Sequence, residues 1–233
     1  MAVPAIELHD LAFGWSAGEP LLSIAHFSVA RGERVLLHGP SGCGKSTLLG
    51  LVGGVIRPSR GTIRLLGEDL TTMSAPQRDA FRAEHMGFIF QLFNLVPYLS
   101  VLDNVLLPLR FSRPRRERVP DPRSEALRLL DALGLQDRRL LQRRATELSV
   151  GQQQRVAAAR AMLGRAEILV ADEPTSALDA DTREAFLRLL MRECASAGSS
   201  VLFVSHDRSL GTCFDRSVPL QELGDLPPGR EPS

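Results

Sequence analysis

The first part of the chain consists of short apolar runs separated by turn residues. Apolar and polar positions alternate over residues 6–37, and the runs break at 18–20 and 31–33, which predicts a small antiparallel sheet of hairpins. The aliphatic run 34–38 predicts a buried strand, and leucines at helical spacing over 46–52 predict a helix.

The remaining apolar runs alternate between strand-like and helix-like spacing. A strand is predicted at 62–67 after the turn at 58–61, and apolar stretches predict strands at 86–90, 167–172 and 200–205. Capping residues and apolar stripes predict helices at 74–84, 124–134, 148–164 and 181–194. Ser124 is the expected N-cap of the second helix. Because strands and helices alternate, we expect an α/β fold with an α-helical insertion at about 92–164.

The composition is that of an ordinary globular protein. Of the 233 residues, 44% are hydrophobic and 24% are charged. The net charge of +1 gives no overall sign of nucleic-acid binding. Three widely spaced cysteines favour a reducing compartment. Since the sequence has neither an apolar run of about 20 residues nor a secretory signal at its start, we expect a soluble, cytosolic protein.

A phosphate-binding motif connects the predicted strand at 34–38 to the predicted helix. The pattern G-x-x-x-x-G-K-[ST] is matched without exception by Gly39, Pro40, Ser41, Gly42, Cys43, Gly44, Lys45, Ser46 and Thr47. Glycines allow successive backbone N–H groups to turn toward an anion, and the following helix begins with its positive end. We expect Lys45 to bind the β- and γ-phosphates of a nucleoside triphosphate, and the Ser46 hydroxyl to ligate Mg²⁺.

The choice of lysine inside this motif supports the assignment. Lys45 is the only lysine in the chain, and the other 27 basic residues are arginines. A compact ammonium fits within a tight loop, whereas a broad guanidinium does not.

Polar residues close three of the predicted strands. Asp172 and Glu173 follow the apolar strand at 167–172, where two carboxylates are costly unless they pair with a metal. We expect Asp172 to hold Mg²⁺ and Glu173 to be the general base toward water. Gln91 could hold Mg²⁺ or the attacking water, or be a solvated loop residue. His206 could reach a γ-phosphate oxygen, although a lone histidine is more often structural.

Trp15 and the arginine-rich segment 110–123 each leave two interpretations open, and Ser149 begins a further candidate phosphate site. Trp15 is either a hairpin side chain packed on its neighbours or a platform for an adenine ring. Ser149, followed by Gly151, begins a helix that could receive phosphate oxygens. Because Lys45 already binds phosphates in its own loop, this helix start is expected to face a nucleotide held by a second copy. The arginine-rich segment 110–123 is most often a solvated loop, and contact with anionic lipid or a partner is the alternative.

In their order and spacing, these motifs resemble the ATP-binding subunits of ABC transporters, over residues from about 6 to 223. The most specific element is the signature-like Leu148-Ser149-Val150-Gly151-Gln152. The resemblance implies a phosphate-loop NTPase core with a mainly parallel sheet, an antiparallel β subdomain and an α-helical subdomain. It places one such domain at 1–224. The Pro- and Gly-rich composition of 225–233 predicts a disordered tail.

The resemblance also implies roles and partners. Trp15 takes the adenine-stacking position, and Ser149, Gly151, Gln152 and Asp179 join the nucleotide site. The cofactors are ATP and Mg²⁺. Two copies form a head-to-tail dimer around two ATP and drive a separate membrane permease, so the protein would be peripheral on the cytoplasmic face of the membrane. No nucleic-acid partner is expected.

One residue departs from the family pattern. The signature usually has two glycines, and Val150 replaces the first. Since Ser149 and Gly151 remain, we expect an active ATPase with a weaker dimer. The segments 88–105 and 152–156 look most similar to the subgroup that serves lipoprotein release and macrolide or peptide export.

Two other function classes are alternatives: a soluble ABC-type ATPase that acts on DNA or ribosomes, and a small-molecule phosphate-loop kinase. A soluble ABC-type ATPase acting on DNA would need long coiled-coil insertions, for which the chain has no room between Lys45 and Asp172. Ribosome-associated members usually carry two cassettes, and one is present. A small-molecule kinase would have no use for the signature serine.

Overall fold

The computed structural model describes residues 2–15 and 21–224. Its contacts divide the chain into two compact units, the first formed by residues 1–82 with 200–233 and the second by residues 83–199. The turn expected at 18–20 and the tail expected at 225–233 lie outside the described residues. The single domain expected at 1–224 stays a prediction.

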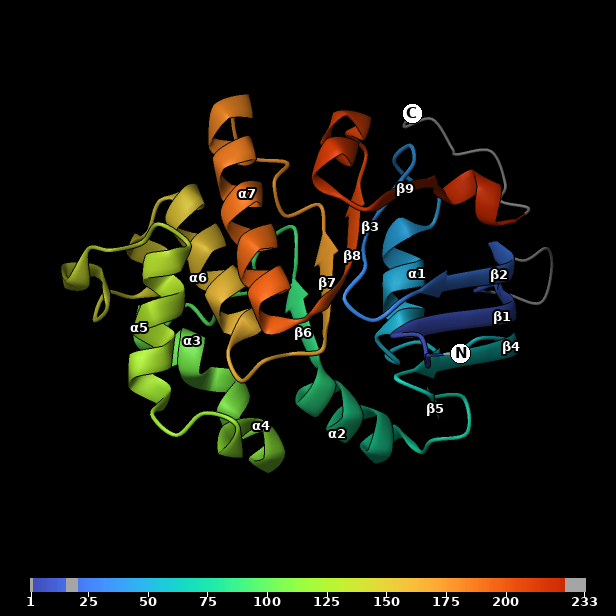
Figure 1. The fold of residues 1–233 in the computed structure, drawn as a ribbon, viewed down its shortest axis with the longest axis horizontal. Helices are drawn as coiled ribbons and strands as arrows, with labels where there is room; N and C mark the ends of the chain where they lie inside the picture. The colour runs from blue at the N-terminus through green and yellow to red at the C-terminus, as the bar shows by residue number, and fades with distance from the viewer. Residues whose placement is uncertain (1, 16–20, 225–233) are drawn as a thin grey trace. The chain divides into compact units, whose positions relative to one another are not determined.

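An antiparallel sheet forms one part of the first unit (Figure 1). Its order is β2-β1-β4-β5, with bounds β1 (Ile6–Phe13), β2 (Leu22–Val29), β4 (Arg60–Leu65) and β5 (Glu68–Asp69). Ile6 lies opposite Val29 and Phe13 opposite Leu22, so β1 and β2 form the expected hairpin. Its alternating positions bury one apolar face.

Parallel strands form the other part of the first unit. Strand β3 (Arg34–His38) pairs in parallel with both β8 (Ser200–Ser205) and β9 (Arg216–Pro219). The helical elements of this part are α1 (Lys45–Val52), η4 (Arg208–Cys213) and η5 (Leu220–Leu223), while α2 (Ala75–His85) contains the position where the first unit ends. The apolar residues of β3 and β8 are fully buried, which agrees with their continuous apolar sequence.

The second unit contains one parallel strand pair and most of the helices. Strand β6 (Met86–Ile89) pairs in parallel with β7 (Ile168–Asp172). The helices are α3 (Val101–Leu106), α4 (Arg113–Glu117), α5 (Pro122–Ala132), α6 (Val150–Met162) and α7 (Ala180–Ala197), with 3₁₀ turns η1 (Leu107–Arg110), η2 (Arg138–Leu140) and η3 (Ala145–Glu147). Together, parallel strands, an antiparallel sheet and helices confirm the α/β class.

Helix α6 is the centre of the second unit. It contacts α3, α5 and strand β6 (Figure 1). A Cβ at Gly87 of β6 would lie 2.2 Å from the Ala161 carbonyl oxygen of α6, so only glycine permits this approach. The alanines of α6 also permit close packing, because their small side chains let the helix lie near its neighbours.

The beginning of α5 differs from the sequence prediction. The N-cap is Asp121, whose carboxylate accepts hydrogen bonds from the Ser124 amide at 3.1 Å and hydroxyl at 2.6 Å. The expectation that Ser124 caps this helix was wrong, because Pro122 already has the backbone angle of a first helical residue.

The arginine-rich segment 110–123 is not simply a solvated loop. It contains α4, and Arg115 within α4 is buried, with 2% of its surface exposed. Burial lowers the pKa of Arg115 from its usual value to about 10, with a smaller contribution from Arg118, so the side chain stays charged at neutral pH.

Helices long and apolar enough to cross a bilayer are absent from the described part of the chain.

Candidate functional site

The loop at residues 39–44 joins β3 to α1 and has the backbone of an anion-binding nest. Gly42 and Gly44 have φ angles of 80° and 95°, in the left-handed region that glycine enters without strain. Gly44 is the N-cap of α1, and the first turn of α1 contains no acidic residue. The backbone N–H groups of this helix start therefore suit a bound phosphate.

Lys45 lies inside this loop. It is 6% exposed, and its Nζ donates hydrogen bonds to the carbonyl oxygens of Gly39 and Pro40, each at 2.8 Å. Charge-assisted bonds to two loop carbonyls hold the ammonium where the loop closes. The neighbouring Ser46 is exposed and Cys43 is buried. The residues of this loop fit a triphosphate, since they offer a cation, backbone donors and a hydroxyl in consecutive positions.

Two histidines lie at the same edge of the parallel strands. The register pairs His38, the last residue of β3, with Ser205, the last residue of β8. His206 therefore follows β8 beside the start of the phosphate loop, and it is exposed. His38 is buried, and its Nδ1 has no hydrogen-bond partner within the described residues. Burial is the main cause that lowers the pKa of His38, and Arg208 adds to it.

Trp15 combines both interpretations given above. Its ring meets Phe13 edge-on with centroids 5.0 Å apart, yet 72% of the residue is exposed. An indole held at its edge and open to solvent can still accept a stacked base.

The carboxylate pair lies at the end of β7 in the second unit. Asp172 is the last residue of this strand, and Glu173 has a φ of 42°. A positive φ is uncommon for glutamate and re-aims the side chain relative to a continuing strand. Both residues are half-buried. The sequence gives no signal for this backbone conformation.

The signature segment begins α6 with a capping box. The Ser149 hydroxyl accepts from the Gln152 amide at 3.3 Å, and the Gln152 side-chain oxygen accepts from the Ser149 amide at 2.9 Å. Ser149 is exposed, while Gly151 and Gln152 are half-buried.

Gln154 connects this helix to the carboxylate turn, and it was missed from sequence. The residue is fully buried, and its side-chain nitrogen donates to the Pro174 carbonyl at 2.9 Å. This bond fixes the start of α6 relative to Glu173, because Pro174 is the next residue in the chain. A glutamine in an otherwise apolar helix face is the signal that could have revealed it.

Gln91 and Asp179 are the remaining predicted residues of the second unit. Ile89 pairs with Ala171, so Gln91 and Glu173 each come two residues after paired positions of β6 and β7. Gln91 is exposed. Asp179 is the N-cap of α7 and accepts from the Thr182 amide at 2.9 Å; hydrogen bonds from Thr182 lower the pKa of its carboxyl. Gln91, Glu173 and the start of α6 thus belong to one unit.

The oxygen donors among these residues suit magnesium. Ser46, Asp172 and Gln91 offer a hydroxyl, a carboxylate and an amide oxygen, which are hard ligands of the kind that Mg²⁺ prefers. Within residues 2–15 and 21–224, clusters of three or more His, Cys, Asp or Glu that could hold a metal are absent. The loop and His206 belong to the first unit, and the carboxylates and signature to the second.

Comparison with known proteins gives consistent results. The family model described as ABC transporter matches residues 22–176. The chain is 38% identical over 202 residues to the lipoprotein-releasing system ATP-binding protein LolD of Pseudomonas fluorescens, with 87% of each chain covered. It is 41% identical to the ABC transporter ATP-binding protein YbbA of Escherichia coli K12, covering 92% of this chain and 93% of YbbA.

A longer relative and a solved structure extend the comparison. The macrolide export ATP-binding/permease protein MacB of Bordetella avium is 39% identical over 95% of this chain, and the match spans 33% of MacB. The dimeric structure of the bacterial ABC transporter cassette MJ0796 has a TM-score of 0.80 and 34% identity, covering 92% of this chain and 93% of that one. The chain belongs to the ABC transporter family and has its ATPase cassette fold.

Proposed function

We propose that the chain is the ATP-hydrolysing subunit of an exporter or of a system that handles lipoproteins or peptides. In this proposal, it drives a separate membrane permease from the cytoplasmic face. Relatives named for macrolide export and for lipoprotein release support the direction of transport. The MJ0796 cassette has been solved as a dimer, including one post-hydrolysis state with ADP and Pi.

The proposal includes a head-to-tail dimer with two ATP. It is carried by one observation: the chain has two helix starts of the phosphate-binding kind, one at Lys45 and one at Ser149. The glycine loop at 39–44 and the cation of Lys45 already provide a site for one triphosphate. A second helix start with an exposed serine is useful when it meets the γ-phosphate held by another copy.

The reaction transfers the terminal phosphoryl group of ATP to water and gives ADP and phosphate. When bound, Mg²⁺ would neutralise charge on the phosphate oxygens. Glu173 accepts a proton from the attacking water, and Gln91 orients that water. His206 and Lys45 donate hydrogen bonds to phosphate oxygens, where negative charge is greatest. Asp172 and Ser46 would hold Mg²⁺ through a carboxylate and a hydroxyl oxygen, and Trp15 stacks on the adenine.

The first experiment tests whether Glu173 is the general base. Glu173→Gln keeps the shape of the side chain but cannot accept the proton, so we expect a loss of at least about a hundredfold in ATPase rate with ATP affinity retained. The variant should form an ATP-dependent dimer in size-exclusion chromatography, and Glu173→Gln with Lys45→Ala should stay monomeric. ATP hydrolysis at the normal rate by Glu173→Gln would show that another group is the base.

The second experiment tests the head-to-tail arrangement by mixing two differently tagged chains, both carrying Glu173→Gln. One also carries Lys45→Ala and the other Ser149→Asp, so each alone has two defective sites. In a head-to-tail dimer, the mixture restores one complete site, formed by Lys45 of one copy and Ser149 of the other. ATP-dependent capture of one tag by the other is the expected result. Capture absent from the mixture but present between two Glu173→Gln chains would contradict this arrangement.

A further inference from the structure

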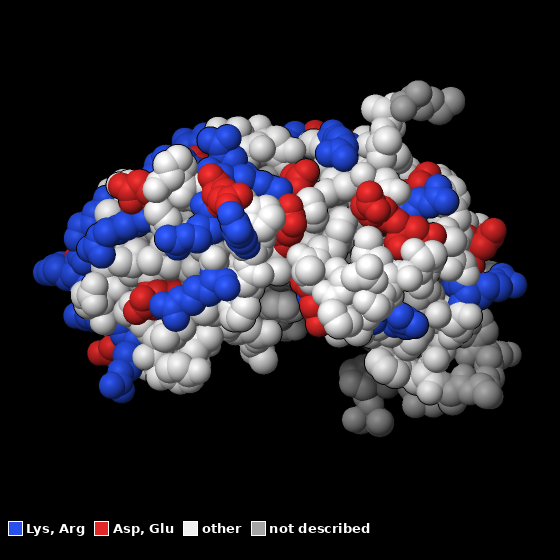
Figure 2. Space-filling view, turned by 90° about the horizontal axis from the view of Figure 1, so that it is seen from below, with Lys and Arg blue, Asp and Glu red and all other residues white. Residues whose placement is uncertain are grey.

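Charge is unevenly distributed along the chain. Residues 110–165 contain fourteen arginines and six carboxylates, a formal net charge of +8, whereas the rest of the chain has a net charge of −7. Figure 2 shows the basic side chains gathered over the part of the surface where Figure 1 places the helices of the second unit. A near-neutral protein therefore has a strongly cationic helical region.

The six carboxylates in this segment are all engaged. Four of them pair with arginines of the same segment, in the pairs Glu117–Arg113, Glu125–Arg128, Asp131–Arg138 and Asp137–Arg139. The other two, Asp121 and Glu147, cap helical turns. Arg110, Arg116 and Arg165 are exposed and form no ion pair with a carboxylate of the described chain.

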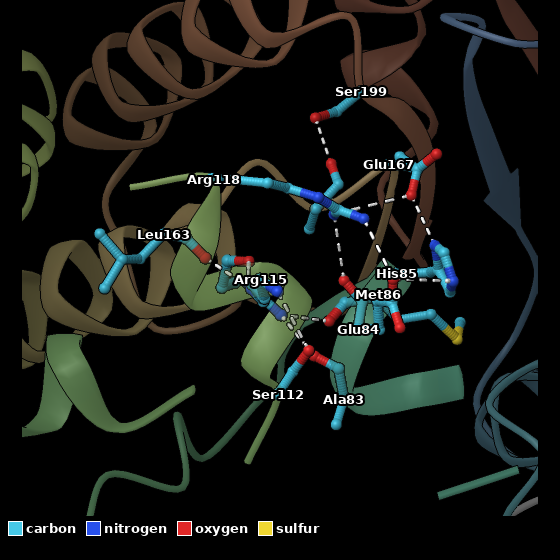
Figure 3. Close-up of polar contacts among 12 residues, drawn as sticks. Ala83, Glu84, His85, Met86, Ser112, Arg115, Arg118, Leu163, Glu167 and Ser199 are labelled. Atoms are coloured by element: carbon cyan, nitrogen blue, oxygen red, sulfur yellow. Dashed lines mark hydrogen bonds and ion pairs between the residues drawn. The ribbon is translucent and has the colours of Figure 1, made fainter. Parts of the chain in front are cut away.

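Helix α4 is anchored from beneath by Arg115 (Figure 3). Its guanidinium donates to the carbonyl oxygens of Leu163 at 2.6 Å, Ala161 at 2.7 Å, Met86 at 2.9 Å and Ala83 at 3.4 Å. Arg118 adds an ion pair with Glu84 at 3.3 Å. These bonds lock the inward side of a helix of only five residues, which would be unstable alone.

Because its inward side is locked, α4 presents its other residues outward. Arg113 has a side chain that is 89% exposed, Arg116 is exposed, and Phe111 is 70% exposed. Phe111 is therefore a large apolar side chain in water, with arginines one residue before it and two after it. We call Arg110, Phe111, Arg113, Arg116 and Arg165 the basic face.

Two neighbouring hollows border the basic face, which contributes Arg113 and Arg116 to one and Arg165 to the other. The charged residues that line the first, of about 350 Å³, are Arg113, Arg116 and Glu117. The second, of about 380 Å³, is lined by Arg118, Arg128 and Arg165 together with the carboxylates of Asp121 and Glu125. They share Val119 and Pro120, so they adjoin. Each has room for a phosphate-sized anion beside guanidinium groups, which bind phosphate well.

We propose that the basic face docks on the anionic phospholipids of a membrane surface. Arg110, Arg116 and Arg165, which form no ion pair with a described carboxylate, attract phosphate headgroups. A single exposed phenylalanine between arginines suits the boundary between headgroups and acyl chains. The anchored α4 keeps the backbone of Arg113 and Arg116 in place, so little ordering of this segment is required on binding. The inference concerns the second unit alone and does not depend on a dimer or a permease.

The test measures sedimentation of the full chain with vesicles of phosphatidylcholine, with or without phosphatidylglycerol. We expect binding only to the anionic vesicles, and less of it as salt increases. The variant Arg110→Gln/Arg113→Gln/Arg116→Gln should bind on the order of one hundredfold more weakly, from three lost cations near the surface. The control Arg138→Gln/Arg139→Gln/Arg188→Gln removes the same charge from exposed arginines outside the basic face and should bind normally. Phe111→Ser should weaken binding to a smaller extent.

ATPase activity in solution separates this inference from the proposed function. Both triple variants should hydrolyse ATP at the rate of the unchanged chain, which also shows that they fold. The proposal would be overturned if both triple variants weakened binding to anionic vesicles equally. It would also be overturned if the unchanged chain bound neutral and anionic vesicles equally. Displacement of the protein from anionic vesicles by RNA at equal phosphate concentration would reassign the basic face to nucleic acid.

Discussion

Ser149 and Gln152 cap each other across the first turn of α6, through hydrogen bonds of 3.3 Å and 2.9 Å. The serine hydroxyl is therefore held at the helix start before any nucleotide is bound. In the proposed dimer, the same hydroxyl meets the phosphate of the opposite copy. One side chain thus has a structural and a functional role, and these roles can be separated by substitution.

Ser149→Ala should lower stability, whereas Ser149→Asp should not. Alanine removes the cap and should cost about 1 kcal/mol in unfolding free energy, while aspartate is as good an N-cap as serine. Both should lose ATPase activity, since alanine lacks the hydroxyl and aspartate repels phosphate. Thermal unfolding and phosphate release measure the two effects. Normal hydrolysis by Ser149→Asp would show that this helix start does not meet a phosphate.

Val150→Gly should strengthen the ATP-dependent dimer. Val150 is 47% exposed at the first position of α6, where the family signature usually has glycine. A branched side chain at this position keeps a partner's backbone at a distance, and glycine permits a closer approach. In the Glu173→Gln background, the dimer fraction at limiting protein concentration should rise. A decrease would indicate that Val150 itself contributes contact area.

Arg115→Met should strongly destabilise the second unit. The substitution leaves several buried carbonyl oxygens without a donor, and we expect a loss on the order of 3 kcal/mol. Urea unfolding measures this loss, and Arg113→Met on the exposed side of α4 is the matched control. If the unfolding free energies of the two variants differ by less than about 0.5 kcal/mol, Arg115 is not the residue that anchors α4.

His38 should make the protein less stable below neutral pH. Its pKa is lowered in the folded state, mainly by burial, so the unfolded chain takes up a proton first as the pH falls below the usual value of 6.5. Stability is therefore complete above that value and decreases until the folded-state pKa is passed. His38→Leu removes the titration and should flatten the dependence of the melting temperature on pH between about 7.5 and 5. An unchanged dependence would place its origin in other groups.

Much of the fold could be predicted from the sequence because its signals are local. The phosphate loop at 39–47 needs glycines and a lysine at fixed spacing, and the order strand, loop, helix is written in adjacent residues. The same holds for the start of α6, where Ser149 and Gln152 are three residues apart. The prediction of the N-cap of α5 was wrong because both Asp121 and Ser124 are residue types that cap helices, and Pro122 favours the earlier helix start.

The sequence by itself determined the nucleotide-binding chemistry of this protein: the glycine loop, Lys45, and the acidic end of an apolar strand. Only the tertiary structure decided which arginines lie inside. Arg115 and Arg116 are adjacent and chemically identical, yet Arg115 is buried among carbonyls that come from 29 to 48 residues away in the chain. A cation can be buried only where distant segments of the chain provide hydrogen-bond acceptors, and the residues next to it in sequence do not indicate whether they will.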